Sequence, residues 1–521
     1  MQILAYKPGH DGHVAHVDDG RLAFSLEAEK DSGPRYGKIK PDLLMRAFAL
    51  APHAPDVIAV SGWSRAFRPL SGPVEAGYFG LGADTLLTRP HRWFGRDVTL
   101  FSSSHERSHI LCSYGLSPFE QGQPCYALTW EGLIGTYYRV NADLSITSLG
   151  GPIDGPGHKY AFLYGLADPG LPTEGGISRR EDAGKLMALA AFHDGSPVDA
   201  EQQTLIDAIL DLPTNDRWIE KAAFADSRYC DIGLDHQDFR NLAWHFSQAL
   251  YHRFEDYAAK HLTEGLPLLI GGGCGLNCDW NSNFQRSGLF ADTFVPPCTN
   301  DSGSAIGTAI DAQFHLTGNA KLDWSVYAGE PFVTDAADLS GFTARPRDNA
   351  EIAKRLAAGQ IFALAQGKYE IGPRALGNRS LIAAPFSGET HTRLNTVKQR
   401  EGFRPIAPIC LEEEADTHFD SHGPSPYMLY FQRVKSAELG AITHVDGSAR
   451  MQTVNAAQNP GAYDLLQAFK AETGYGVLCN TSLNFKGTGF INRMSDLVAY
   501  VRDRGLDGFI VDDTAYFRDL A

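Results

Sequence analysis

The spacing of apolar residues changes along this chain, and that change constrains the fold more than any other feature. Residues 3–30 alternate apolar and polar positions around two turn signals, Pro8-Gly9 and Asp18-Asp19-Gly20, which predicts a short antiparallel meander. Residues 239–262 instead repeat apolar side chains every three or four positions, as an amphipathic helix does, and a strand-like run at 266–270 follows. Hairpins, helices and buried strands in one chain predict an α/β fold rather than a helical bundle or a sandwich.

The chain is also longer than one hydrophobic core usually sustains, because it has 521 residues, so at least two domains are expected. Residues 343–348 are polar and contain a proline, and a new helix at 350–358 and a new strand at 361–365 follow them. We therefore expect a first domain over residues 1–345 and a second over residues 346–521.

Charge and cysteine content narrow the class of protein. The formal net charge of -16 repels a polyanion on average, so no nucleic-acid partner is expected. The eight cysteines are scattered without a CxxC pair, which is typical of a reducing compartment. No signal-peptide pattern opens the chain and no apolar run is long enough to cross a membrane, so we expect a cytoplasmic protein without a membrane partner.

A candidate metal site begins with two histidines four residues apart. If the segment is helical, His105 and His109 lie one turn apart on the same face, and the serines just before them are candidate N-caps. The segment is also a literal HExxH, in which Glu106 would activate a zinc-bound water and Glu131 would be a third ligand. Two polar surface histidines are the simpler alternative.

Two further segments of the first part carry polar or glycine-rich turns. Asp301 stands in a turn that enters a small-residue helix, where it is either an N-cap or an inward-facing ligand. A strand that ends in glycines at 271–273 lets backbone N–H groups approach a phosphate or ribose, which makes Gly272, Gly273 and Asn277 candidate nucleotide-binding residues. Tight packing of the glycines is the alternative.

The second part of the chain concentrates cations in short, glycine-rich or polar segments. Guanidinium groups in such segments can clamp phosphate oxygens, and hydroxyl and amide groups at a strand end can hold ribose and phosphate. In a chain this acidic, their density predicts an anionic partner, unless the arginines only pair with nearby glutamates on a solvated face. The candidates are Arg374, Arg379, Lys398, Arg404, Arg450, Ser482 and Asn484.

In this order the segments resemble the NodU/CmcH-type O-carbamoyltransferases almost from end to end. The resemblance rests on Gly9-His10-Asp11-Gly12, His105 with His109, the glycines at 271–277, Asp301-Ser-Gly, GPRALGNRS at 372–380, KQREGFRPIAP at 398–408, HVDGSARMQT at 444–453 and NTSLNFKG at 480–487. It is closest to the branch that acts on cephalosporin hydroxymethyl groups, because Glu27-Ala28-Glu29-Lys30 stands where the family usually has Glu-Glu-Arg.

The resemblance implies both an architecture and a reaction. An actin-like ATPase (ASKHA) domain, akin to the one in tRNA threonylcarbamoyladenosine synthesis, would be followed by a YrdC-like domain. The second domain would make carbamoyl adenylate from carbamoyl phosphate and Mg²⁺-ATP. The first domain would then transfer the carbamoyl group to the hydroxyl of a small-molecule acceptor, a sugar, a cephem, a macrolide or another alcohol.

The resemblance also implies roles for individual residues. Lys398 and Arg404 would contact phosphate at the adenylation site, with the other cationic and polar candidates of the second part around them. His105, His109 and Asp301 would hold an iron(II) ion, and His10 would take the proton from the acceptor hydroxyl. The family often has an aspartate where this chain has Glu131, which would be a fourth ligand.

Two other classes of function stay open from the sequence. The HExxH segment is also typical of a zinc metalloprotease, and an actin-like nucleotide-binding module without catalysis would share the glycine-rich strand end. A homodimer and a monomer are both compatible with the sequence.

Overall fold

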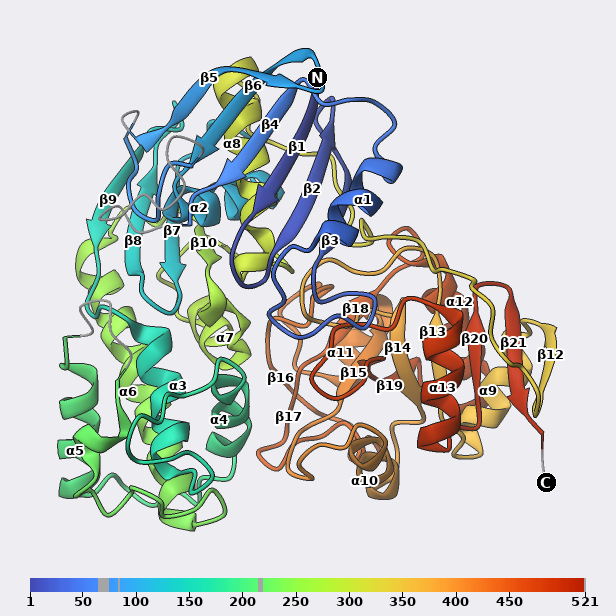
Figure 1. The fold of residues 1–521 in the computed structure, drawn as a ribbon. Helices are drawn as coiled ribbons and strands as arrows, with labels where there is room; N and C mark the ends of the chain where they lie inside the picture. The colour runs from blue at the N-terminus through green and yellow to red at the C-terminus, as the bar shows by residue number, and fades with distance from the viewer. Residues whose placement is uncertain (64–74, 83–84, 214–218, 520–521) are drawn as a thin grey trace. The chain divides into compact units, whose positions relative to one another are not determined.

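The computed structural model describes residues 1–63, 75–82, 85–213 and 219–519, which form two compact units. Unit 1 contains residues 1–116 and 301–521, and unit 2 contains residues 117–300. Both units combine mixed sheets with helices, so the expected α/β class is confirmed (Figure 1). A division at residue 345 and the actin-like and YrdC-like assignments stay predictions.

The first sheet of unit 1 begins with the expected meander. β1 pairs antiparallel with β2, which pairs antiparallel with β3, and the parallel neighbours β4 and β6 extend the sheet on the other side of β1. The strand order is β3-β2-β1-β4-β6-β5, with bounds Gln2–Lys7 (β1), His13–Asp18 (β2), Arg21–Glu27 (β3), Val57–Ser61 (β4), Leu87–Trp93 (β5) and Arg96–Ser103 (β6).

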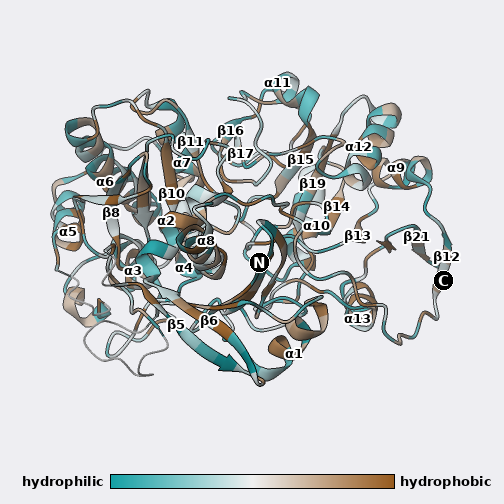
Figure 2. Ribbon diagram, turned by 90° about the horizontal axis from the view of Figure 1, so that it is seen from above, coloured by the Kyte–Doolittle hydropathy of each residue, from teal (hydrophilic) through white to brown (hydrophobic). Residues whose placement is uncertain are grey.

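Three helices accompany this sheet: α1 (Pro41–Leu50), α2 (His105–Leu116) and α8 (Ser304–Thr317). α8 packs on β1, β2, β4 and β6 and also on α2, and ten of its residues are buried. β5 is an edge strand with mostly exposed polar residues, and it is coloured largely teal in Figure 2. Polar edge strands resist pairing with other chains.

The second sheet of unit 1 has eight strands in the order β12-β21-β20-β13-β14-β19-β15-β18. Their bounds are Phe342–Pro346 (β12), Phe362–Ala365 (β13), Arg379–Ala383 (β14), Ala407–Leu411 (β15), Gln452–Val454 (β18), Val477–Ser482 (β19), Gly508–Val511 (β20) and Thr514–Arg518 (β21). A two-stranded sheet of β16 (Gln432–Arg433) and β17 (Ser448–Ala449) accompanies it.

Both faces of the central strands of this eight-stranded sheet are buried, and β13 shows how. Phe362 and Leu364 belong to one core cluster, with residues of α9 and α12, whereas Ala363 and Ala365 belong to another, with residues of α10 and α13. Alternate side chains of a strand point to opposite faces, so an apolar run is expected when both faces are covered. The helices are α9 (Asn349–Ala357), α10 (Gly388–Val397), α11 (Ala415–His418), α12 (Pro460–Thr473) and α13 (Met494–Arg504).

Unit 2 has a five-stranded sheet in the order β11-β10-β7-β8-β9 and several helices. Its strands are β7 (Cys125–Trp130), β8 (Gly135–Val140), β9 (Ile146–Gly150), β10 (Leu268–Gly271) and β11 (Thr293–Phe294). Its helices are α3 (Pro156–Ala167), α4 (Asp182–Ala190), α5 (Ala200–Leu210), α6 (Gln237–His261) and α7 (Cys278–Arg286). The helix predicted at 239–262 and the strand predicted at 266–270 are confirmed as α6 and β10.

Among the described residues, no helix combines the length and the apolar character that crossing a membrane requires.

Candidate functional site

The two histidines of the HExxH segment lie on the first turns of a helix, as predicted. β6 ends at Ser103, and the backbone N–H of Arg107 donates to Ser104 Oγ at 3.1 Å, which caps α2 at its first residue, His105. His105 and His109 are both buried, and their Nε2 atoms are 3.1 Å apart. Their spacing of one turn therefore brings two imidazole nitrogens to a common point.

Asp301 completes this group from a distant part of the sequence. It begins a short 3-10 helix directly before α8, which packs on α2, and its Oδ1 lies 3.5 Å from His105 Nε2 and 3.4 Å from His109 Nε2. A point equally distant from these three atoms, in their plane, lies about 1.9 Å from each of them. This distance is close to the ~2.0–2.2 Å of metal–nitrogen and metal–oxygen bonds. The three residues therefore fit one metal ion, and two imidazoles with one carboxylate suit iron(II) among other divalent ions.

The other oxygen of Asp301 is held by a buried lysine that the sequence analysis did not select. Lys7 Nζ donates to Asp301 Oδ2 at 2.8 Å and to the carbonyl oxygen of His10, and its side chain is fully buried. Burial alone raises the pKa of Asp301, but the charges of Lys7 and His105 bring that pKa well below its ordinary value. Asp301 is therefore held as a carboxylate. The only signal for Lys7 was its place at the end of β1, just before the His10 motif.

His10 lies beside this group with one ring nitrogen engaged. Its Nδ1 is 2.7 Å from Asp11 Oδ2 and 3.5 Å from Asp301 Oδ2, and the edge of the Trp63 ring packs against it at 4.7 Å between centroids. Asp11 has a φ of 49°, a left-handed turn conformation that aspartate tolerates better than most residues. The sequence prediction that His10 and Asp301 belong to one site agrees with these distances.

Four of the residues that the sequence analysis predicted for the two sites lie in unit 2. Glu131 is buried directly after β7, and its backbone N–H donates to Ile134 O at 2.8 Å. Gly272 has a φ of +96°, and a Cβ added to it would lie 2.5 Å from Trp130 O, so tight packing alone requires a glycine here. Gly273 has open space where a Cβ would be, and Asn277 Oδ1 accepts from the backbone of α7 as its N-cap. Their metal-binding and nucleotide-binding roles stay predictions.

The second predicted site gathers around Lys398 in unit 1. Lys398 is the C-cap of α10 and is buried, and its Nζ donates to the carbonyl oxygen of Ser482 at 2.5 Å and to Asn484 Oδ1. Ser482 ends β19, and its Oγ donates to Asn484 Oδ1 at 2.6 Å. The structure therefore brings together three candidates from two separate sequence motifs.

The charges of several arginines act on Lys398. Burial, followed by the charges of neighbouring arginines, lowers the pKa of Lys398 well below its ordinary value; those arginines are Arg400, Arg404, Arg35 and Arg504. Burial and the charges of Arg404 and Arg450 lower the pKa of Arg400 to about 9. The buried Nε atoms of Arg450 and Arg504 have no hydrogen-bond partner among the described residues. Arg504 ends α13 outside every motif, so no sequence signal selected it.

Arg379 differs from the expectation, because it is used inside the protein. Its side chain is fully buried, and its guanidinium group donates five hydrogen bonds, to Asn492 Oδ1 twice and to the carbonyl oxygens of Gln366, Gly367 and Asn378. A guanidinium has five N–H groups, so none remains for a phosphate. This arrangement does not favour a nucleotide contact for Arg379.

The loop before Arg379 is shaped by a buried carboxylate. Glu370 Oε1 accepts from the backbone N–H groups of Leu376 at 2.6 Å, Asn378 at 2.8 Å and Arg379 at 3.2 Å. Part of the GPRALGNRS motif is thus explained by the turn that it makes around this carboxylate. Arg374, which precedes the turn and is half-buried, remains a candidate for a phosphate contact.

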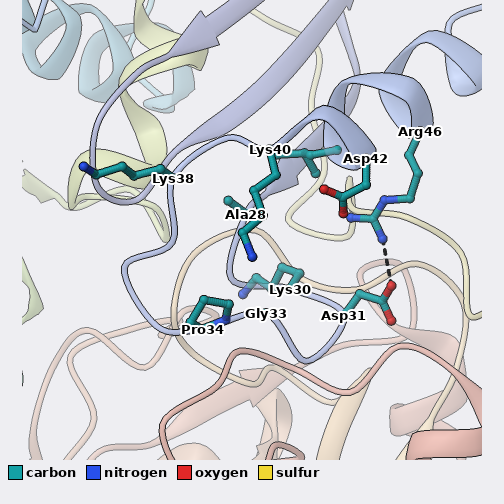
Figure 3. Close-up of a pocket in the computed structure, with 10 residues that line it drawn as sticks. Ala28, Lys30, Asp31, Gly33, Pro34, Lys38, Lys40, Asp42 and Arg46 are labelled. Carbon is teal, nitrogen blue, oxygen red and sulfur yellow. Dashed lines mark hydrogen bonds and ion pairs between the residues drawn. The ribbon is translucent and has the colours of Figure 1, made fainter.

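A separate pocket is lined by the segment that connects β3 to α1 and by α1 itself, and Figure 3 shows the lining residues. Its two more enclosed cations are already paired. Lys30 Nζ donates to Gly372 O at 2.6 Å, and Arg46 Nη1 lies 2.8 Å from Asp31 Oδ2 and 3.1 Å from Glu330 Oε2. These two cations of the pocket are therefore used in contacts inside the protein, whereas Lys38 and Lys40 at its rim are exposed.

Comparisons with known proteins cover almost the whole chain. The family model described as "Carbamoyltransferase N-terminus" matches residues 89–310, and that described as "Carbamoyltransferase C-terminus" matches residues 353–518. The chain is 48% identical to a 3'-hydroxymethylcephem-O-carbamoyltransferase of Amycolatopsis lactamdurans and 46% identical to that of Streptomyces clavuligerus, over 99% of each chain. It is 33% identical to nodulation protein U of Sinorhizobium fredii, over 94% of this chain and 95% of that protein.

A solved structure of full-length HypF, in its phosphate- and nucleotide-bound form, matches 34% of this chain and 23% of that chain. Its TM-score is 0.24 and its sequence identity 17%, too little to transfer a fold.

Proposed function

The chain belongs to the carbamoyltransferase family, and we propose that it uses carbamoyl phosphate and ATP to carbamoylate the hydroxymethyl group of a cephem in antibiotic biosynthesis. The acceptor is proposed from the two relatives at 46–48% identity, both of which act on 3'-hydroxymethylcephem by name. Family membership also decides for a carbamoyltransferase over the metalloprotease and the non-catalytic module. In a metalloprotease, Glu106 would activate a zinc-bound water. Here Glu106 Oε2 instead accepts a hydrogen bond from the backbone N–H of Gly80 at 2.8 Å.

The observation that carries the use of ATP is the cation cluster around Lys398. In a chain with a net charge of -16, burial and then the charges of four arginines lower the pKa of one lysine. Like charges at short range are unfavourable unless an anion joins them. The phosphates of ATP and of carbamoyl phosphate are anions of the right kind, and Mg²⁺ is expected to accompany ATP.

The proposed reaction has two stages. Carbamoyl phosphate is first hydrolysed to carbamate and phosphate, and a carbamate oxygen attacks the α-phosphorus of ATP, so that pyrophosphate leaves and carbamoyl adenylate forms. The acceptor hydroxyl then attacks the carbonyl carbon of carbamoyl adenylate, and AMP leaves with the electron pair of the broken C–O bond. Lys398 and Arg404 neutralise the charge that develops on the phosphates in the first stage.

His10 is proposed as the base of the second stage. An alcohol must lose its proton as it attacks, and an imidazole placed beside it is a common base for that step. The contact between His10 Nδ1 and Asp11 fixes the ring, as a carboxylate partner does for other histidine bases, and leaves Nε2 to receive the proton. Lys7 holds the backbone of His10 and the carboxylate of Asp301 in fixed relation.

His105, His109 and Asp301 are proposed to hold an iron(II) ion, and Glu131 is proposed as an additional ligand. When bound, this ion would supply Lewis-acid polarisation of a carbonyl oxygen. We assign this second stage to an actin-like domain over residues 1–345 and the adenylation stage to a YrdC-like domain over residues 346–521.

The test separates the two stages. Pyrophosphate released from ATP is measured with and without carbamoyl phosphate, and carbamoylated product is measured by mass with a 3'-hydroxymethylcephem acceptor. Lys398→Ala and Arg404→Ala should abolish both readouts. His10→Asn should retain pyrophosphate release and lose product. Wild-type protein that releases no pyrophosphate with both substrates present would refute the use of ATP, and equal loss of both readouts in folded His10→Asn would refute the division into stages.

A further inference from the structure

One aromatic ring packs against three residues of the first candidate site. Trp63 comes two residues after the end of β4, and its backbone N–H donates to Glu75 Oε2 at 2.6 Å. The centre of its ring lies 4.7 Å from that of His10 and 5.6 Å from that of His105, and the rings are nearly perpendicular in both pairs. Lys7 Nζ lies over the same ring, 3.7 Å from its centre. Trp63 therefore joins the proposed base, a proposed metal ligand and the buried lysine beside them.

The turn that carries His10 is shaped to admit this ring. A Cβ added to Gly9 would lie 2.2 Å from Trp63 Cε2 and 2.5 Å from Trp63 Cζ2, closer than real side chains come. Only a glycine leaves room for the indole at this position. The indole therefore lies directly on the backbone of the turn that precedes His10.

The indole face also completes the surroundings of a fully buried ammonium group. Lys7 Nζ donates to Asp301 Oδ2 at 2.8 Å and to the carbonyl oxygen of His10. A lysine ammonium has three N–H donors, so one donor remains after these two oxygens. The negative face of an indole attracts a cation, and at 3.7 Å it can accept this third donor. An ammonium held from three sides keeps the His10 turn and the carboxylate of Asp301 at a fixed separation.

The ring of His10 itself is anchored mainly at one nitrogen. Its Nδ1 lies 2.7 Å from Asp11 Oδ2, and its side chain is 24% exposed. The last torsion of a histidine side chain has broad energy wells, so a contact at one nitrogen leaves the ring able to tilt. A perpendicular ring packed against His10 limits this tilt, and Trp63 supplies it.

We propose that Trp63 is a positioning residue of the transfer site, which holds the Lys7 ammonium at its face and the His10 ring beside it, so that His10 Nε2 stays directed toward the acceptor hydroxyl. The proposal rests on the proposed function for the role of His10 as the base. The alternative is a tryptophan that only fills space. The two differ in one respect, because a space-filling ring acts through its volume, whereas a ring that binds a cation also acts through the charge of its face.

The test changes the charge of the ring face and keeps its shape. Suppression of a stop codon at position 63 introduces tryptophan analogues with one, two and three fluorine atoms, which weaken the negative face stepwise. Trp63→Leu removes the ring, and Trp63→Phe keeps a smaller one. The same changes at Trp244 are the matched control, since this ring also stacks on a histidine, His193, at 4.3 Å between centres, and belongs to neither candidate site.

Three quantities are measured on the full-length protein. They are kcat and the acceptor KM for carbamoylated product, pyrophosphate release from ATP with carbamoyl phosphate, and hydrogen exchange of peptides that cover residues 7–12. Trp63→Leu should lower kcat about 10- to 30-fold, the level of a desolvated cation–π contact. The acceptor KM and pyrophosphate release should stay unchanged, because Trp63 acts through Lys7 and His10. Trp63→Phe should recover part of the loss, and residues 7–12 should exchange faster in Trp63→Leu.

The fluorinated series decides between the two roles even where Trp63→Leu fails to fold. At position 63, kcat should fall with each added fluorine, and at position 244 it should stay level. A kcat that is unchanged across the series at position 63 overturns the proposal, as does a folded Trp63→Leu with wild-type kcat. If wild type forms no product with the cephem acceptor, the proposed function fails, while the exchange of residues 7–12 still decides whether the ring holds the His10 turn.

Discussion

A buried ion pair joins the two helices that position the predicted metal ligands. Arg107 on α2 donates from Nε to Asp311 Oδ2 at 2.9 Å and from Nη2 to Asp311 Oδ1 at 2.7 Å, and its Nη1 donates to Leu81 O at 2.7 Å. The two side chains are 9% and 1% exposed. Because α2 begins at His105 and Asp301 directly precedes α8, this pair holds the ligands of both helices in register.

Removing one partner should be costly. Asp311→Ala leaves the guanidinium of Arg107 buried and without its carboxylate, which lowers the free energy of unfolding by about 3–5 kcal/mol. The double variant Arg107→Met/Asp311→Leu replaces the pair by apolar side chains and should be close to wild type or more stable. Glu264→Ala breaks a bidentate ion pair between two more exposed side chains, Arg139 (28% exposed) and Glu264 (49% exposed). This variant should lower the free energy of unfolding by only ~0–1 kcal/mol.

Hydrogen exchange of peptides from α2 and α8, followed by mass spectrometry, measures this difference locally. A loss of 3–5 kcal/mol corresponds to about 10²- to 10⁴-fold faster exchange where opening limits it. Asp311→Ala should also bind added iron(II) more weakly, because the helices that carry its ligands separate more readily. The reasoning is refuted if Asp311→Ala exchanges no faster than Glu264→Ala, or if the apolar double variant exchanges as fast as Asp311→Ala.

Three further predictions follow from the two sites. His109→Ala should lose most of the iron that wild type retains after anaerobic loading, measured by elemental analysis, whereas Glu106→Gln should keep it, because the Glu106 carboxylate binds the Gly80 backbone instead; equal iron in both variants would contradict the ligand set. Since burial and nearby arginines lower the pKa of Lys398, binding of the ATP phosphates should raise that pKa again and take up a proton, so affinity falls as pH rises. Calorimetry in two buffers of different ionisation heat detects this uptake, which Lys398→Met should abolish. Burial raises the pKa of Glu27 to about 7 from 4.5, so its contribution to stability is present below pH 4.5 and is lost as pH rises through 7. Between these pH values wild type should lose about 3 kcal/mol more free energy of unfolding than Glu27→Gln, and equal slopes in urea titrations would contradict the assignment.

The local elements could be predicted because their signals are local. The antiparallel meander of β1–β3, the helix α6, the strand β10 and the cap of α2 at Ser104 depend on apolar spacing and on one hydroxyl group. The same is true of the turn of helix between His105 and His109. For these features, the residues that decide the structure are neighbours in sequence.

The meeting of Asp301 with the histidines depends instead on how closely α8 packs on α2. A Cβ added to Gly307 would lie 1.8 Å from Ser108 O, so this glycine allows a contact between backbones that are almost 200 residues apart in sequence. No local pattern marks a glycine as a site of helix contact. The turn by itself left Asp301 either as an N-cap or as a ligand, and only the family resemblance favoured the ligand.

Arginine posed the opposite difficulty, because its residue type does not say what it binds. Arg379 stands in a glycine-rich motif typical of a phosphate site, yet protein acceptors take all five of its N–H groups. Arg35 and Arg504 lie outside the cationic motifs and still contribute to the charge at Lys398. Whether an arginine is structural depends on the number of acceptors around it, which only the folded chain determines.

The two candidate sites differ in how their charges are balanced, and this difference suits the two proposed stages. At the first, one buried lysine, Lys7, offsets the charge of one buried carboxylate, Asp301. At the second, burial and the charges of several arginines lower the pKa of Lys398, and Glu401 is 3.9 Å from Arg404 and 39% exposed, so it offsets little of the arginine charge. Such a site is stabilised most by a bound polyanion, because the anion's charge offsets the repulsion between the cations. This stabilisation is lost once pyrophosphate and phosphate have left. Carbamoyl adenylate carries a single phosphate charge, so it should be held there less tightly than ATP, which favours its departure toward the site of transfer.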